Sequence, residues 1–370
     1  MVDERRIVEQ WKRGGARVLV TVVRVEGSSY RRVGARLLLG ESGEYVGTIS
    51  GGCLETEVVR KAAWKVRDGA VVERYSTLFD DTAEVPYGLG CGGVVDLLLE
   101  PAETAECAAV LGAMERALQG ERSTVVTWLP GEGKGLRRAV LSADGVLKFA
   151  SDGLSDKKLA CAQGLAAGQE YEGRFVEEMR RPQRLFVLGA GDDARPLVAM
   201  ATMMGWSVTV ADGRAQLTRA ERFAGADRVV AIVDGEIAPL GIRAEDAVVV
   251  MTHSYEQDRG LLAKLLPIAP RYLGLLGARH RSSLLVSEAA MIAGLSVEAC
   301  CARIWAPVGL DLGGDGPEAI ALAVMAEAQA ACMGKIGASR RLSAEDVARH
   351  VSEGRVSRYL QTHCAAGLRE

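Results

Sequence analysis

RLFVLGAGDDARPLVAMATMMGWSVTVADGR, the stretch from Arg184 to Arg214, specifies the fold of this chain. Apolar residues 185–188 run directly into Gly189-Ala190-Gly191, and a second apolar segment, 206–211, ends on Asp212. A helical pattern of apolar residues connects the two segments. The sequence therefore predicts a strand, a tight turn, a helix and a second strand, in that order.

The turn has the residue types that a bound nucleotide requires. Gly189 allows a sharp turn, Gly191 lets the backbone approach a diphosphate, and the free amides at the start of the helix favour an anion. Asp212 follows Gly191 by about 20 residues, the spacing at which a carboxylate holds a ribose hydroxyl, and Arg214 comes two residues later. We therefore predict a Rossmann-like unit in which Gly189, Gly191, Asp212 and Arg214 bind a cofactor.

Two acidic residues in the same turn compete with an anionic ligand. Asp192 and Asp193 stand between Gly191 and Ala194, and Ala194 replaces the third glycine of the motif. An alternative role for their carboxylates is to cap the N-terminus of the helix and to complement its dipole, in competition with an anionic ligand for the same amides. The alternative to a tightly bound dinucleotide is a fold that kept its turn and lost its ligand.

Length and composition are those of an ordinary globular chain. The chain has 370 residues, of which 48% are hydrophobic and 25% charged, and its formal net charge is −3. Aromatic residues make up 5% and no basic stripe accompanies them, which argues against a nucleic-acid partner. The N-terminus is charged rather than signal-like, and no apolar run approaches the roughly 20 residues of a membrane span. We expect a cytoplasmic protein with no membrane partner.

Two cysteines stand among glycines. The chain has eight cysteines and no export signal, which predicts reduced thiols. Cys53 follows Gly51-Gly52 in the first turn of a predicted helix, where helix amides lower the pKa of a thiol; a small buried residue packed on glycine is the alternative. Cys91 precedes Gly92 in a glycine-rich run that can contribute little to a core, which predicts an exposed sulfur.

The loop at 26–36, EGSSYRRVGAR, is a further candidate site. It lies between two apolar segments that are predicted to be strands. Ser28, Ser29 and Arg31 supply hydroxyl groups and a guanidinium group, which are donors to phosphate oxygens. The competing interpretation is a solvated turn.

The predicted organisation is α/β throughout. The predicted segments are a small N-terminal α/β domain with the cysteine loops (1–101), a mixed α/β extension and linker (102–183), a Rossmann-like domain (184–335) and a charged helical tail (336–370). We expect a charged link over 170–183. Short apolar strands alternate with helices after Asp212, which is typical of a parallel sheet covered on both faces. Asp315 is expected to cap the helix that begins at Pro317.

Several of these motifs together resemble the XdhC/CoxI family. The motifs are Gly27-Ser28-Ser29 with Arg31, GTISGGCLE at 47–55, Gly90-Cys91-Gly92-Gly93, Gly189-Ala190-Gly191 with Asp212-Gly213-Arg214, Met251-Thr252-His253 with Asp258, and the segment 307–311. The resemblance covers roughly residues 5–101 and 184–332. The chain departs from the family at Tyr30, where proline is usual, and at Asp192-Asp193, where Gly-His is usual.

The members of this family are accessory factors for molybdenum hydroxylases such as xanthine dehydrogenase. The resemblance implies that the chain binds the molybdenum cofactor, as molybdopterin or its dinucleotide form, protects it while its terminal sulfur ligand is added, and hands it to the apo-hydroxylase. It also implies a cysteine desulfurase or sulfurtransferase as a second partner, and no turnover of the chain's own. The loop with Ser28, Ser29 and Arg31 or the Gly189 turn would hold the phosphate. Cys91 is the first candidate for a contact with molybdenum or sulfur, and Cys53 the second.

Two other functions fit parts of the sequence. An NAD(P)-dependent oxidoreductase would use the Gly189 turn, with His253 or a cysteine as its acid or base; alternatively, His253 is a structural residue at the end of a strand. A pure interaction protein would dock a hydroxylase and a sulfurtransferase without touching cofactor, but it would not need cysteines among glycines. A homodimer is a hypothesis that no assembly motif in the sequence supports.

Overall fold

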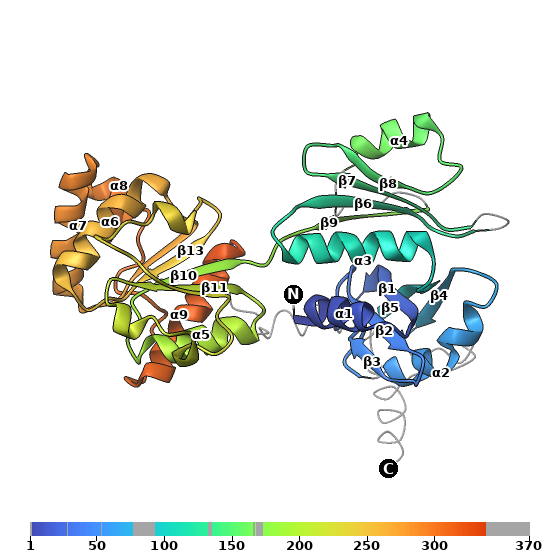
Figure 1. Cartoon of the computed structure of the whole chain (residues 1–370), viewed down its shortest axis with the longest axis horizontal. Helices are drawn as coiled ribbons and strands as arrows, with labels where there is room; N and C mark the ends of the chain where they lie inside the picture. Colours follow the sequence, from blue (N-terminus) through green and yellow to red (C-terminus); the bar gives the residue numbers. More distant parts are fainter. Residues whose placement is uncertain are drawn as a thin grey trace, which may run out of the picture. The chain divides into compact units, whose positions relative to one another are not determined.

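The computed structural model describes residues 2–27, 29–52, 54–76, 93–131, 135–165, 167 and 173–337. These residues divide into two compact units, one formed by Val2–Arg181 and the other from Pro182 onward. Figure 1 labels the helices and strands of both units.

The first sheet of the N-terminal unit is antiparallel. Its strands are β1 (Ala16–Gly27), β2 (Arg36–Gly40), β3 (Tyr45–Gly47), β4 (Val71–Ser76) and β5 (Gly93–Pro101), in the order β3-β2-β1-β5-β4. The β-branched run of β1 lies at the centre of the sheet. Alternate residues of β1 face opposite sides: Val18 and Val20 pack in the cluster of helix α2 (Glu55–Lys65), and Leu19 packs in the cluster of helix α1 (Val2–Arg13).

A second antiparallel sheet completes this unit. Its strands are β6 (Ser123–Trp128), β7 (Arg137–Ser142), β8 (Leu147–Ala150) and β9 (Arg174–Met179), in the order β8-β7-β6-β9, and α4 (Asp156–Gln163) follows β8. Helix α3 (Ala105–Leu118) lies between the two sheets, and its buried residues share one core with residues of both (Figure 1).

Strand β9 corrects the prediction of a charged link over 170–183. It pairs with β6 along its whole length, from Arg174 opposite Trp128 to Met179 opposite Ser123. The acidic residues of this segment were interpreted as those of a linker. In the fold, Glu177 is neutralised by Arg36, and no local sequence pattern reveals this long-range ion pair. Helix α4 was not predicted either.

A buried ion pair links the two sheets. The guanidinium of Arg138, on β7, donates two bonds to the carboxylate of Glu100, on β5, at 2.8 and 3.0 Å. The two side chains are 2% and 0% exposed. Arg138 also donates to the hydroxyl of Thr127 and to the carbonyl of Glu106. The bonds compensate the desolvation of both charges, which is costly for an unpaired buried ion.

The second unit is a parallel sheet in the order β12-β11-β10-β13-β14. Its strands are β10 (Arg184–Leu188), β11 (Ser207–Asp212), β12 (Arg228–Ala231), β13 (Ala247–Val250) and β14 (Tyr272–Leu275). Its helices are α5 (Ala194–Met203), α6 (Tyr255–Ile268), α7 (Arg279–Ala293), α8 (Val297–Cys301) and α9 (Pro317–Cys332), with 3₁₀ turns η1 (Ala215–Leu217), η2 (Ala220–Arg222) and η3 (Ala238–Leu240).

Helices cover both faces of this sheet, because successive strand residues alternate between two cores. Leu185 and Val187 of β10 pack with α5 and α9, whereas Phe186 and Leu188 pack with α6 and α7 (Figure 1). The strand order is that of a Rossmann-like unit. The predicted fold class, a small N-terminal α/β domain with a C-terminal Rossmann-like parallel sheet, is confirmed.

The start of α9 differs from the prediction by one residue. Its cap is Gly316 rather than Asp315, and Pro317 occupies the first helical turn as expected. The predicted charged tail lies outside the described residues from position 338 onward. In the described part of the chain, no helix combines the length and apolarity that a membrane crossing needs.

The Glu100–Arg138 pair gives a stability prediction. Glu100→Gln leaves a buried guanidinium without its counter-charge, so we expect the free energy of unfolding to fall by about 3–5 kcal/mol. Urea unfolding followed by circular dichroism measures the change. The control is Asp68→Asn, because Asp68 pairs with Arg67 at the surface and is 85% exposed. Similar unfolding midpoints for the two variants would contradict the assignment.

Candidate functional site

The glycine turn after β10 is set by close packing against the loop after β13. Gly189 has φ +134°, and a Cβ at this position would lie 2.3 Å from the carbonyl oxygen of Met251 and 2.9 Å from the amide of Thr252. The turn is also bonded to its neighbours: the Gly189 amide donates to the carbonyl of Ala211 at 2.8 Å. Glycine is therefore required by backbone contact alone, whether or not a ligand binds.

Asp212, the predicted ribose acceptor, is fully buried and bonded within the protein. Its Oδ1 accepts from the amide and Nε of Arg214 at 2.8 and 2.9 Å, and its Oδ2 accepts from the Ala190 amide and from Arg214 Nη2, both at 2.7 Å. Burial alone would raise the pKa of Asp212, but the bonds from Arg214 and the amides outweigh it and lower the pKa. Asp212 and Arg214, which were both predicted to bind a cofactor, are therefore bonded to each other.

Arg222, the last residue of η2, also bonds to the glycine turn after β10. Its Nη1 donates to the carbonyls of Ala190 and Leu217, each at 2.8 Å, and its Nη2 donates to Asp192 Oδ1 at 2.9 Å. The Asp192 side chain nevertheless remains 82% exposed.

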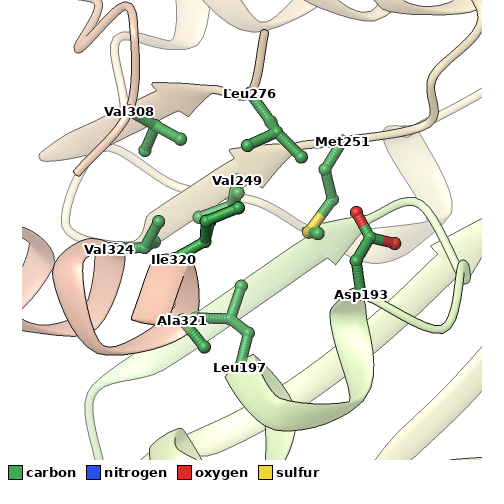
Figure 2. A pocket seen from close by; sticks show the side chains of 9 residues that line it. All are labelled: Asp193, Leu197, Val249, Met251, Leu276, Val308, Ile320, Ala321 and Val324. Carbon is green, nitrogen blue, oxygen red and sulfur yellow. The ribbon is translucent and has the colours of Figure 1, made fainter. Parts of the chain in front are cut away.

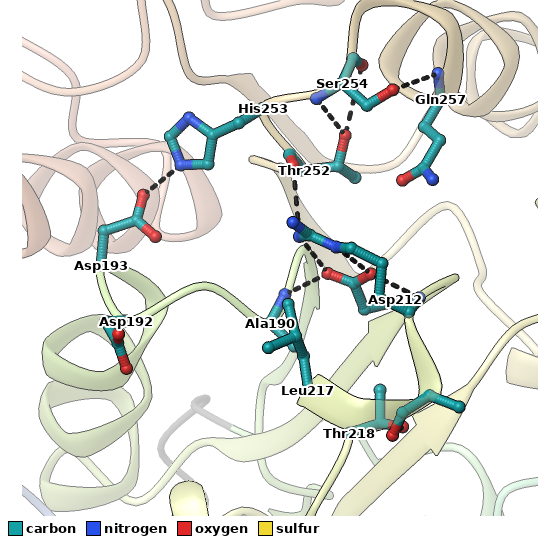
Figure 3. A network of polar contacts seen from close by, with 12 residues as sticks. Ala190, Asp192, Asp193, Asp212, Leu217, Thr218, Thr252, His253, Ser254 and Gln257 are labelled. Atoms are coloured by element: carbon teal, nitrogen blue, oxygen red, sulfur yellow. Dashed lines mark hydrogen bonds and ion pairs between the residues drawn. The ribbon is translucent and has the colours of Figure 1, made fainter.

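Asp193 bridges the loops that follow β10 and β13. Its Oδ2 lies 2.7 Å from Nε2 of His253, whose side chain is 59% exposed (Figure 3). His253 has φ 63°, in the left-handed region that residues other than glycine adopt at a cost. Neither Asp192 nor Asp193 makes a capping bond: α5 has no side-chain cap. The expectation that these carboxylates cap the helix is wrong, because Arg222 and His253 engage them instead.

Asp258 anchors the loop that presents His253. Its buried Oδ1 accepts from the Thr252 hydroxyl at 2.6 Å, and its Oδ2 accepts from Nη2 of Arg281 at 2.7 Å. Arg281 lies at the start of α7, so this pair joins the ends of β13 and β14. The sequence placed Asp258 in a motif but gave it no role.

A small cavity lies beside Met251 and Leu276, which follow β13 and β14 (Figure 2). Its volume is about 10 Å³, which is room for roughly one water. Asp193 is the one charged side chain among the described residues that line it; the others are Leu197, Val249, Met251, Leu276, Val308, Ile320, Ala321 and Val324.

The N-terminal unit brings a second group of predicted residues together. Arg31 Nη2 donates to Asp3 Oδ2 at 2.7 Å, and the Thr48 hydroxyl donates to the same oxygen at 3.3 Å. The ring of Tyr30 lies over Gly51, with its Cγ 3.5 Å from where a Cβ of Gly51 would stand. The loop that carries Ser29 and Arg31 therefore contacts the loop that carries Gly51 and Gly52.

Glu55 shapes the second of these loops, and the sequence interpretation missed it. Its carboxylate, 1% exposed, accepts from the amides of Ile49 and Ser50 at 3.1 and 2.8 Å and from the Ser50 hydroxyl. Ser50 Oγ in turn accepts from the amides of Gly52 and Leu54. Burial raises the pKa of Glu55, but these hydrogen bonds lower it further than burial raises it. The sequence feature that could have indicated this role is a carboxylate in the first helical turn, five residues after a serine.

Four predicted site residues, Ser28, Cys53, Cys91 and Gly92, lie outside the described residues. The described residues that flank Ser28 and Gly92 lie at one end of the first sheet. Gly27 pairs with Gly93, and Ser76 pairs with Val94.

Comparison with known proteins gives the family. A model described as the XdhC and CoxI family matches residues 10–76, and one described as the XdhC Rossmann domain matches residues 185–328. The chain belongs to the XdhC/CoxI family. The resemblance stated from the sequence motifs is thereby confirmed.

Two relatives and one solved structure are similar to most of the chain. A probable xanthine dehydrogenase subunit of Bacillus subtilis is 28% identical over 84% of this chain and 91% of its own length. A "Molybdenum cofactor insertion chaperone PaoD" of Escherichia coli is 26% identical over 87% of this chain and 86% of its own length. A crystal structure described as a xanthine dehydrogenase from Bacillus halodurans superposes with TM-score 0.76 at 29% identity, covering 94% of this chain and 99% of that one.

The two glycines of the turn give a matched prediction. Gly189→Ala places a methyl group against backbone atoms at a positive φ, whereas Gly191→Ala meets first the flexible carboxylate of Asp193, 2.4 Å away. We expect Gly189→Ala to lower the melting temperature by several degrees more than Gly191→Ala. Differential scanning calorimetry tests this. Equal melting temperatures would show that the turn can shift away from Met251.

Proposed function

We propose that this protein is an accessory factor that binds the molybdenum cofactor and delivers it, after sulfuration, to a xanthine dehydrogenase-type molybdenum hydroxylase. The observation that carries the proposal is the meeting of two family-motif loops at one end of the N-terminal sheet, where Tyr30 lies on Gly51 and Asp3 binds both Arg31 and Thr48. Support also comes from the PaoD chaperone, whose likeness extends over both units of this chain.

The described residues suit the anionic end of a pterin cofactor. Arg31 has five N–H donors in a planar group, which match the oxygens of a phosphate, and its side chain is 33% exposed. Gly51 and Gly52 are exposed, and Gly52 has φ 105°, a conformation that glycine adopts without strain. Ser28 and Ser29 add hydroxyl donors from the sequence.

The sulfur-facing part of the proposed site consists of two cysteines. We assign Cys91, with Gly92, as the first contact with the molybdenum or its sulfur ligand, and Cys53 as the second, because a thiolate is a soft ligand. Glu55 holds the loop that leads into Cys53, through Ser50. The terminal sulfur would come from a cysteine desulfurase or sulfurtransferase, so the chain itself supplies binding and protection.

The nicotinamide-dependent alternative has less support. Both oxygens of Asp212, the residue that would hold the ribose, are already bonded to Arg214 and Ala190. His253, its proposed acid or base, is paired with Asp193.

The proposal is tested by cofactor retention in cysteine variants. Purified full-length Cys91→Ala should lose anaerobic binding of molybdenum cofactor in calorimetric titration and should no longer raise the activity of the apo-hydroxylase. The matched control is Cys161→Ala: Cys161 is free and exposed, and its sulfur lies 3.6 Å from Arg174 Nη1 in the second sheet. Unchanged binding and unchanged hydroxylase activation by Cys91→Ala would contradict the assignment of Cys91.

A further inference from the structure

The Rossmann-like unit has its ligand crevice at a defined place. Strand β10 lies between β11 and β13, and the order of the chain reverses there. In open parallel sheets, ligands bind outside the carboxyl ends of the strands at this point. The loops that border it here are 189–193, after β10, and 251–254, after β13.

The carboxylate of Asp193 lies across this crevice. It comes from the first loop and reaches the second, with Oδ2 2.7 Å from His253 Nε2. Its Oδ1 lies 2.4 Å from the place where a Cβ of Gly191 would stand. Gly191 is the residue whose missing side chain would let a diphosphate approach the backbone. The carboxylate of Asp193 therefore lies where the diphosphate of a bound nucleotide would lie.

The carboxylate that was expected to hold a ribose is occupied as well. Asp212 receives four hydrogen bonds from Ala190 and Arg214. Two acidic groups of the motif, Asp193 and Asp212, are therefore both engaged within the protein.

The neighbouring aspartate provides the contrast. Asp192 carries the same charge at the same helix start, but its carboxylate bonds to Arg222 and is 82% exposed. Figure 3 shows the Asp193 carboxylate directed to His253 and the Asp192 side chain directed elsewhere. If negative charge alone weakened nucleotide binding, both aspartates would contribute. Only Asp193 places its carboxylate in the crevice.

We propose that Asp193 is a specificity-determining residue that excludes nucleoside diphosphates from the Rossmann-like unit. Its carboxylate takes the space and the position of the diphosphate, and a diphosphate placed beside it would meet a like charge. On this proposal, the role of the glycine turn is to let the loop after β10 pack closely against the loop after β13. This inference goes beyond the proposed function and does not depend on it.

The test is calorimetric titration of the full-length protein with ADP, and with adenosine as a ligand that lacks the diphosphate. Asp193→Ala should bind ADP at least about tenfold more tightly than the wild type, a change of about 1.4 kcal/mol, with the weak response to adenosine unchanged. Asp193→Asn keeps a side chain of the same shape in the crevice and should gain less. Asp192→Ala removes the same charge from outside the crevice and should leave the affinity for ADP unchanged.

Three outcomes would overturn the proposal. Micromolar binding of ADP to the wild type would show that the crevice is open. Equal gains in Asp192→Ala and Asp193→Ala would assign the effect to charge at the helix start. No gain in Asp193→Ala with a wild-type melting temperature would show that the carboxylate is not the barrier. Should Asp193→Ala melt earlier, Asp193→Ser replaces it, because serine is smaller than aspartate and suits a helix start.

Discussion

The buried carboxylate of Asp212 holds the carboxyl edge of the parallel sheet together. A buried charge is tolerated only with a full set of hydrogen bonds, and Asp212 obtains them from the Ala190 amide and from Arg214. The first bond fixes the glycine turn after β10. Arg214 also donates to the carbonyl of Thr252 at 3.3 Å, so it reaches the loop after β13. One carboxylate thus connects the ends of three neighbouring strands.

The same principle shapes the rest of the protein. Asp258 joins the ends of β13 and β14 through Thr252 and Arg281. In the N-terminal unit, Glu100 connects the two sheets through Arg138, and Glu55 folds the loop that carries Gly51 and Gly52. Each acid is nearly or completely buried, and each receives donors from another element or loop. The proposed cofactor loop with Gly51 and Gly52 is therefore tied to a buried carboxylate whose hydrogen bonds are made within the protein.

The sequence predicted the fold class because local patterns set it. Apolar runs ending in glycine or aspartate, alternating with helical segments, can bury their surface only in a parallel sheet with helices on both faces. In the N-terminal unit, the two strands that flank the loop at 26–36 were predicted from their apolar runs. Strand β9 was missed because its acidic residues resemble a linker until Arg36 is brought to Glu177 from 141 positions away. The capping role given to Asp192 and Asp193 was wrong for the same reason, since their partners, Arg222 and His253, are distant in sequence.

Short-range pattern was enough to specify the fold class, the glycine turn and the residue types available to a site, and the resemblance of the motifs to the XdhC/CoxI family gave the family. What the polar residues of those motifs contact became known only from the packed fold. Asp212 and Asp193 each bond to groups of the protein, and a sequence motif alone does not reveal these bonds. The reason is physical: a buried carboxylate is stabilised by whichever donors the fold brings to it, and the positions of those donors are a property of packing between elements.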